Sequence, residues 1–252
     1  EQKELVGISV ALGTYKRHET SMKLFQEFLK FKYKANDIPV NEVDVDMLKK
    51  YQHYLMTVRH NNNNTTVKYL RNLGKVLNLA VTKKLVQSSA LEELKLKIEP
   101  VDKGFLNKTE LTKLAEKEFD VVRLEQVRDV FLFCCYTGLA YVDVHSLTND
   151  DIVEDGERLW IRKARHKTSV MCHIPIIKPA RDILNKYASF APNTGKLLPV
   201  LSNQKMNAYL KEIAAIVGIE KDLTTHLARH TELPLSLKLN GLQRFVSCQV
   251  TI

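Results

Sequence analysis

Cysteine is scarce in this sequence, which has only four in 252 residues. Cys134 and Cys135 are adjacent inside an apolar run, where helical side chains face different ways, so the pattern is not a disulfide framework. No apolar stretch approaches the roughly 20 residues that a membrane span requires, and no signal peptide opens the chain. We therefore expect a cytoplasmic protein without a membrane partner.

Acidic residues are outnumbered, with 29 Asp and Glu against 38 Lys and Arg. The resulting formal charge of +9 favours a polyanionic partner, nucleic acid first, although a solvated basic surface explains the charge equally well. An apolar fraction of 44% is normal for globular cores. The first residue is Glu1 and not Met, which leaves open whether a further domain precedes it.

Apolar residues at helical spacing organise the first hundred residues, with Pro39 and Asn41 between the first two helices. The residues that share a face are Met22, Phe25 and Leu29, then Leu48, Tyr51 and Leu55, and in a third helix Val67, Leu70, Leu77 and Val81. The polar run Asn61 to Thr66 can cap the third helix. Its other face carries Lys68, Arg71 and Lys75, which suit a phosphate backbone or an ordinary solvated face.

The periodicity stops around Pro100 and Gly104, which predicts a linker over 99–106 between a helical domain at 1–98 and a second domain at 107–231. Asn107 and Glu110 have capping-box spacing, and Gly138 suits the end of a helix that covers 124–136. Further helices are expected from Pro179 to Tyr187 and, capped by Ser202 or Asn203, from there to Val217 before Gly218.

Only one stretch of the second domain predicts a sheet. Asp155-Gly156 is a hairpin turn signal between strands at 151–154 and 158–162, and a third strand covers 170–176. The fold class is therefore mainly α with a small antiparallel sheet, an α+β arrangement.

Three short patterns combine the residues that carry chemistry. They are Tyr136-Thr137-Gly138-Leu139 at a helix end, Lys167-Thr168 between two strands, and His226-Leu-Ala-Arg229-His230-Thr231 opening a helix. His226 and Arg229 project from one helical face and can jointly hold a phosphate oxygen. Taken alone, the last pattern is better explained as an exposed basic helix start.

In this order and spacing the patterns resemble the tyrosine recombinase, or phage integrase, family. Gly13 to Ser21, Asn62 to Tyr69 and Leu197 to Leu210 look most like integrases of conjugative transposons. The resemblance implies an N-terminal SAM-like core-binding domain and a catalytic domain that together clamp double-stranded DNA. It also implies a bacterial, nucleoid-associated location and, in the intact protein, a homo-tetramer on DNA.

The chemistry implied by the resemblance is DNA strand exchange through a 3′-phosphotyrosine, without a metal or cofactor. Arg229 and His226 would contact the scissile phosphate, and Lys167 would protonate the leaving 5′ oxygen. Arg162 and His230 join Lys68, Arg71 and Lys75 as expected DNA-binding residues.

This sequence departs from the family pattern in its active-site residues. Ala140 stands where the first arginine is expected, and Arg165 is our hypothesis for the residue that compensates. Asp143 is interpreted as a helix cap or a partner for a cation and not as a catalytic acid.

The nucleophile is missing from its expected place. The nine tyrosines end at Tyr209, which we assign to helix packing, so none follows His226. The resemblance stops at Thr231, and the divergent tail at 232–252 contains Pro234 where the family has a helix interior, a substitution that costs about 3 kcal/mol there. A reading-frame shift and a genuine variant both remain open. We expect this chain to be inactive alone.

The favoured function is therefore a site-specific recombinase of which this chain is an incomplete copy. The alternative is a non-catalytic DNA-binding accessory or inhibitor of recombination. A metal-dependent nuclease built on Asp150, Asp151, Glu154 and Asp155 is disfavoured, because carboxylates on a strand and its turn alternate faces. A related topoisomerase would also need the tyrosine.

Overall fold

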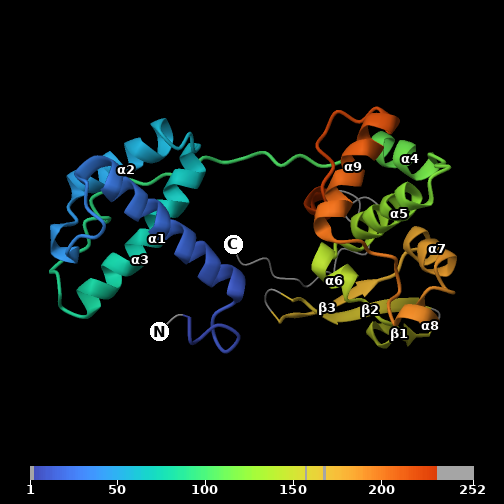
Figure 1. Ribbon diagram of the computed structural model, residues 1–252. Coiled ribbons are helices and arrows are strands. Elements are labelled where there is room, and N and C mark those ends of the chain that lie inside the picture. The colour runs from blue at the N-terminus through green and yellow to red at the C-terminus, as the bar shows by residue number, and fades with distance from the viewer. Residues whose placement is uncertain (1–2, 157, 167–168, 232–252) are drawn as a thin grey trace. The chain divides into compact units, whose positions relative to one another are not determined.

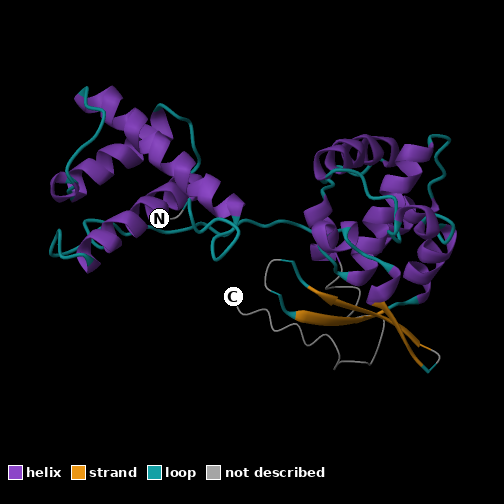
Figure 2. Ribbon diagram, turned by 60° about the horizontal axis from the view of Figure 1, so that its bottom comes forward, coloured by secondary structure: helices purple, strands orange, loops and turns teal. Residues whose placement is uncertain are grey.

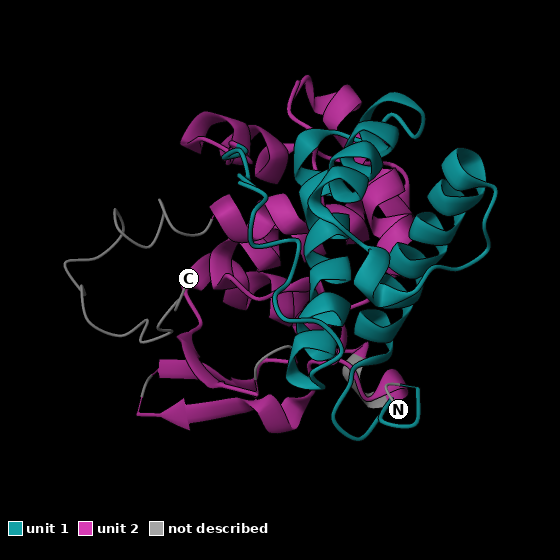
Figure 3. Cartoon of the chain, turned by 90° about the vertical axis from the view of Figure 1, so that its left-hand side faces the viewer, with its two compact units in different colours: residues 1–101 teal, residues 102–252 magenta. Residues whose placement is uncertain are grey.

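The computed structural model describes residues 3–156, 158–166 and 169–231. The chain divides into two compact units, residues 1–101 and 102–252 (Figure 3), and the boundary lies within the range 99–106. Among the described residues, no helix is long and apolar enough to cross a membrane.

Unit 1 is helical, with α1 (Leu12–Tyr33), the short 3-10 helix η1 (Val40–Glu42), α2 (Val45–Thr57) and α3 (Asn63–Thr82) (Figure 1). Side-chain caps begin two of these helices. The Asp44 carboxylate accepts a hydrogen bond from Met47 N at 2.7 Å, and Asn62 Oδ1 accepts one from Thr65 N at 2.9 Å. The cap expected from the polar run at 61–66 is therefore confirmed.

The core of unit 1 is aromatic where α1 meets α2. The Tyr51 ring lies 5.1 Å from Phe25 and 5.2 Å from Phe28, measured between ring centroids, and all three side chains are buried. Edge and tilted contacts of this kind add to the free energy of burial. The predicted apolar faces are buried except at Met22 and Val81, which are half-buried, and in α3 Ala80 is buried where Val81 was expected.

The asparagine run before α3 also holds the segment that leaves unit 1. Asn64 Nδ2 donates to Glu99 O and Asn64 Oδ1 accepts from Glu99 N, each at 2.8 Å, while Asn63 Nδ2 donates to Lys97 O at 3.0 Å. The returning chain packs closely on α3 at Gly74, where a Cβ atom would clash with Leu91 Cδ2. Two amide side chains thus satisfy backbone groups that form no helix or sheet bonds.

Unit 2 is built around α5 (Val122–Thr137), which packs against α4 (Lys108–Glu116), α7 (Lys178–Lys186) and α9 (Asn203–Val217). Because α5 is covered on several sides, most of its residues are buried, Cys134 and Cys135 included. The predicted capping box is present, since Asn107 Oδ1 accepts from Glu110 N at 2.8 Å and Glu110 Oε2 accepts from Asn107 N at 2.7 Å. Gly138 ends α5 with a φ of 66°.

A buried arginine joins two of these helices. Arg128 of α5 donates from its guanidinium to the carbonyl oxygens of Ala115 at 3.0 Å and Lys117 at 2.7 Å, at the end of α4. Its charge is balanced by the neighbouring carboxylate of Asp129, which also accepts from Lys186 Nζ at 2.7 Å. The guanidinium therefore caps α4 in place of a C-terminal glycine.

The sheet has three antiparallel strands in the order β1-β2-β3 (Figure 2). They are β1 (Ile152–Asp155), β2 (Arg158–Ala164) and β3 (Met171–Pro175), preceded by α6 (Tyr141–His145) and the 3-10 helix η2 (Asn149–Asp151). Ile161 pairs with Ile152 on one side and Ile174 on the other, and it is fully buried. The predicted class, mainly α with a small antiparallel sheet, is confirmed, although β2 extends two residues beyond 162.

Candidate functional site

A short helix at 225–231 carries the His226, Arg229 and His230 pattern. Thr224 Oγ1 accepts from Leu227 N at 3.2 Å, and Thr225 N and Oγ1 donate to the side chains of Asn207 and Asn203 on α9, each at 3.0 Å. The side of the helix that faces the rest of unit 2 is buried, with Leu227, Ala228 and Thr231. The helix is thereby fixed with its two histidines and its arginine on the more accessible face.

The two histidines of this helix are in contact. Their Nε2 atoms are 3.2 Å apart, and the rings are nearly perpendicular, with centroids 4.7 Å apart. Lys103 Nζ approaches His226 Nε2 to 3.4 Å from the segment that opens unit 2. Partial burial, followed by His230, Lys103 and Arg229, lowers the pKa of His226, and burial with Lys103 and Arg229 lowers that of His230.

Arg229 lies beside this pair and is half-buried. Within the described part of the chain its guanidinium has no hydrogen bond or ion pair. A half-buried cation without a counter-charge is favourably placed to receive an anion, because the desolvation of its guanidinium has already been incurred. His226, Arg229 and His230 are thus brought together as the sequence predicts.

The connection between β2 and β3 contains the second set of predicted residues. Arg165 Nε donates to Cys172 Sγ at 3.1 Å, and Arg165 N donates to Val170 O at 2.9 Å. The guanidinium is therefore held across the hairpin. Lys167 lies outside the described residues. Arg162 is exposed on β2, where it pairs in register with His173.

Asp143 was predicted to be a helix cap or the partner of a cation, and the structure contradicts the first of these two roles. It is buried in α6, and its Oδ1 accepts a hydrogen bond from His166 N at 3.0 Å. The carboxylate therefore anchors the β2–β3 connection and does not cap its own helix. Ala140, the residue in the place of the expected arginine, forms the N-cap of α6 without a side-chain cap bond.

The predicted basic face of α3 is accessible to solvent. Lys68, Arg71 and Lys75 are all exposed. Lys75 Nζ lies 3.2 Å from His18 Nε2 of α1, an interaction that sequence reasoning missed because it joins residues 57 positions apart. Partial burial, then Lys75 and Arg17, lowers the pKa of His18. Two helices of unit 1 thus contribute to one cationic surface.

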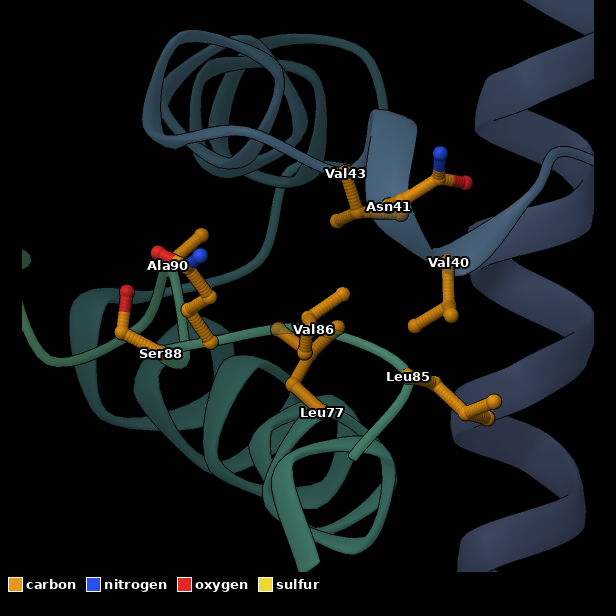
Figure 4. Close-up of a pocket in the computed structure, with 9 residues that line it drawn as sticks. Val40, Asn41, Val43, Leu77, Leu85, Val86, Ser88 and Ala90 are labelled. Carbon is orange, nitrogen blue, oxygen red and sulfur yellow. The ribbon is translucent and has the colours of Figure 1, made fainter. Parts of the chain in front are cut away.

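Other candidate sites are less promising. Asp151 of the acidic cluster is neutralised by Lys163 Nζ at 2.7 Å, and no group of three or more metal-ligating side chains gathers within the described ranges. A cavity of 310 Å³ in unit 1 has no ionisable side chain in its lining (Figure 4). The residues that line it are Val40, Asn41, Val43, Leu77, Leu85, Val86, Gln87, Ser88 and Ala90.

The chain is similar in structure to several DNA recombinases of known structure. The match to a lambda integrase dimer bound to a COC' core site has a TM-score of 0.75 and 14% sequence identity. It covers 94% of this chain and 83% of the lambda integrase chain. For the Tn1549 transposon integrase in complex with a circular intermediate DNA, identity is 16%, the TM-score 0.69, and coverage 95% of this chain and 86% of the other.

The XerH site-specific recombinase bound to its difH substrate matches at 16% identity and a TM-score of 0.66, over 89% of this chain and 69% of that one. No curated protein matches the sequence. The described fold is therefore the fold of these integrases and of the XerH site-specific recombinase. Within it, residues 2–98 match the family model of the phage integrase SAM-like domain, so unit 1 is a SAM-like domain of the phage integrase type.

Proposed function

We propose that this chain is the DNA-binding part of a site-specific recombinase, in which unit 1 and the domain at 107–231 both contact duplex DNA. The observation that carries the proposal is the unpaired Arg229 beside two histidines on one accessible helical face, within a fold whose solved relatives are bound to DNA. Such a group of donors suits a phosphodiester oxygen. A protein that acts on DNA would work at the nucleoid.

The roles within the site follow from the donors available. Arg229 would hold the phosphate through its guanidinium, and His226 would donate to the same group once an anion replaces Lys103 as its neighbour. Arg165 is proposed to supply the cation that Ala140 cannot. Lys167 would act as the general acid for the leaving oxygen, and Lys68, Arg71, Lys75, Arg162 and His230 would contact the DNA.

Strand exchange would need a tyrosine from outside these residues, because no tyrosine follows Tyr209. This favours a second candidate function, a non-catalytic accessory that occupies recombination sites. In the recombinase proposal the chain assembles as a tetramer on DNA and receives the nucleophile from another segment or subunit. The two candidates share DNA binding and differ in covalent chemistry.

The experiment measures binding of the chain to a short DNA duplex of arbitrary sequence, with wild type compared with Arg229→Gln and Arg123→Gln. We expect the first variant to bind more weakly and the second, an exposed arginine of α5, to bind as wild type. Equal affinity of all three proteins would refute the assignment of Arg229.

A nicked suicide substrate tests the covalent step. We expect no protein–DNA adduct from the chain alone. Adding a recombinase of the same specificity that keeps its tyrosine but carries Arg and His substitutions should restore an adduct if the recombinase proposal holds. Continued absence of an adduct in such mixtures would favour the accessory function.

A further inference from the structure

The Nε2 atoms of His226 and His230 face each other at a separation that a single metal ion can bridge. Two Zn–N bonds of about 2.0–2.1 Å at a tetrahedral angle place the nitrogens about 3.3 Å apart. The observed separation is 3.2 Å, and the two rings are nearly perpendicular. Their i, i+4 spacing on one helix maintains this geometry.

We propose that His226 and His230 form a two-histidine site for a borderline-soft divalent cation, with Zn²⁺, Ni²⁺ and Cu²⁺ as the chemical class. Imidazole nitrogen suits these ions, whereas Mg²⁺ and Ca²⁺ require oxygen ligands. With two protein ligands, the remaining coordination positions fall to water. His226 is exposed and His230 half-buried, so the ion can exchange with solvent.

The protonation state of the pair favours coordination. An ammonium group can only donate, so Lys103 Nζ at 3.4 Å requires a lone pair on His226 Nε2 and places that ring's proton on Nδ1. This is the tautomer that an Nε2-bound ion needs. His230 reaches the same state when its proton moves to Nδ1, so a neutral pair binds the ion without a net release of protons.

Two neighbouring cations oppose the ion. Lys103 occupies the side from which His226 Nε2 is approached, and Arg229 is close enough to lower the pKa of both histidines. Lys103 is exposed and reaches His226 through a flexible side chain, so it can withdraw. Moving Lys103 away lowers the affinity for the ion. Substituting Lys103 therefore tests whether the ion binds at His226.

The test is calorimetric titration of the folded 252-residue chain with ZnCl₂ in the absence of DNA. We expect one ion to bind per chain. The affinity for Zn²⁺ should be about 10²-fold weaker in either His226→Gln or His230→Gln, because the second imidazole acts at high effective concentration. Removing the repulsion in Lys103→Gln should strengthen binding roughly tenfold. The matched control is His173→Gln, an exposed histidine on β3, which should bind as wild type.

Ring-nitrogen NMR of the wild type gives a second measurement that does not depend on variants folding. Zn²⁺ should shift the Nε2 resonances of His226 and His230 and no others, and EDTA should reverse the change. No Zn²⁺ binding by wild type, or undiminished binding by the His226→Gln/His230→Gln double variant, would overturn the proposal. So would shifts confined to other histidines.

A regulatory consequence rests on the proposed function. An ion on His226 Nε2 removes the atom that would contact phosphate, so Zn²⁺ should weaken binding to duplex DNA, and His230→Gln should make DNA binding less sensitive to Zn²⁺. Because the ion is detected without DNA, failure of DNA binding and failure of the metal site are separate results. DNA affinity that is unaffected by Zn²⁺ at saturation would overturn the consequence and leave the ion site standing.

Discussion

The buried carboxylate of Asp143 accepts a hydrogen bond from the backbone N–H of His166, with Oδ1 and N 3.0 Å apart. Asp143 belongs to α6, and His166 lies in the connection between β2 and β3. The bond joins residues 23 positions apart and holds the backbone next to Arg165. It therefore fixes the β2–β3 connection, which carries Arg165.

Replacing Asp143 with alanine tests this link. The variant lacks the acceptor and leaves the backbone N–H of His166 without its partner. We therefore expect the free energy of unfolding of unit 2, measured in urea, to fall by about 1.5–3 kcal/mol. The His166 amide should exchange faster with solvent. Asp143→Asn keeps an oxygen in the same place and should retain most of the protection. Unchanged exchange in the alanine variant would show that the bond does not hold the connection.

Arg128 offers a sharper test of stability. Replacing Arg128 with leucine removes the donors to the carbonyl groups at the end of α4. It also leaves the Asp129 carboxylate with one of its two cations. We therefore expect the free energy of unfolding to fall by roughly 3–5 kcal/mol. The control is Arg123→Leu on the same helix, whose ion pair with Glu212 is exposed and contributes about 0–1 kcal/mol. Urea unfolding that ranks the two variants equally would contradict the capping role.

Features that depend on neighbouring residues were predictable from the sequence. The capping box of Asn107 and Glu110, the left-handed Gly138 and the N-cap at Ser202 follow from spacing and from backbone dihedrals that few residues adopt. The predicted faces of α1, α2 and α3 follow from the 3.6-residue period. Each of these signals lies within about one helical turn.

Other contacts of the site and of unit 1 are long-range, and no local pattern carries them. Lys103 meets His226 across 123 positions, and Asn64 holds Glu99 across 35. The capping role of Arg128 could not be predicted for the same reason. A charged residue in an apolar run gives no sign that its guanidinium will bind the carbonyl groups at the end of another helix. Sequence reasoning therefore proposed residues for the site but could not give the long-range partners of those residues.

His18 provides a pH-dependent prediction. Its pKa lies below the ordinary value of 6.5, first because of partial burial and then because of Lys75 and Arg17. Replacing Lys75 with Met should raise this pKa part of the way, since burial persists, and NMR titration of the ring measures it. No change in the variant would show that Lys75 and His18 do not interact in solution.

The sign of the stability effect follows from the same shift. A histidine with a lowered folded-state pKa takes up its proton more readily in the unfolded chain, so it destabilises the fold as pH falls below about 6.5. The pH-dependent loss of unfolding free energy should be smaller in His18→Gln than in wild type. His53→Gln, at an exposed position on α2, serves as the control. Equal pH slopes in all three proteins would count against the shift.

The basic face of α3 predicts how DNA affinity depends on salt. If Lys68, Arg71 and Lys75 each neutralise one phosphate, each substitution by Gln should reduce the slope of log affinity against log salt by about 0.9. Lys50→Gln is the control, because Lys50 is already paired with Asp46 on α2. Titrations with duplex DNA at several salt concentrations measure the slopes.

Contacts made by Lys75 should differ from those of the other two cations. Since His18 lies 3.2 Å from Lys75, a phosphate bound there would raise the pKa of His18, and binding would take up a proton. DNA affinity should therefore increase as pH falls toward the pKa of His18, and this increase should vanish in His18→Gln. A pH-independent affinity together with an unchanged salt slope in Lys75→Gln would mean that DNA does not reach this part of the face. Lys68 and Arg71 would then carry the phosphate contacts alone.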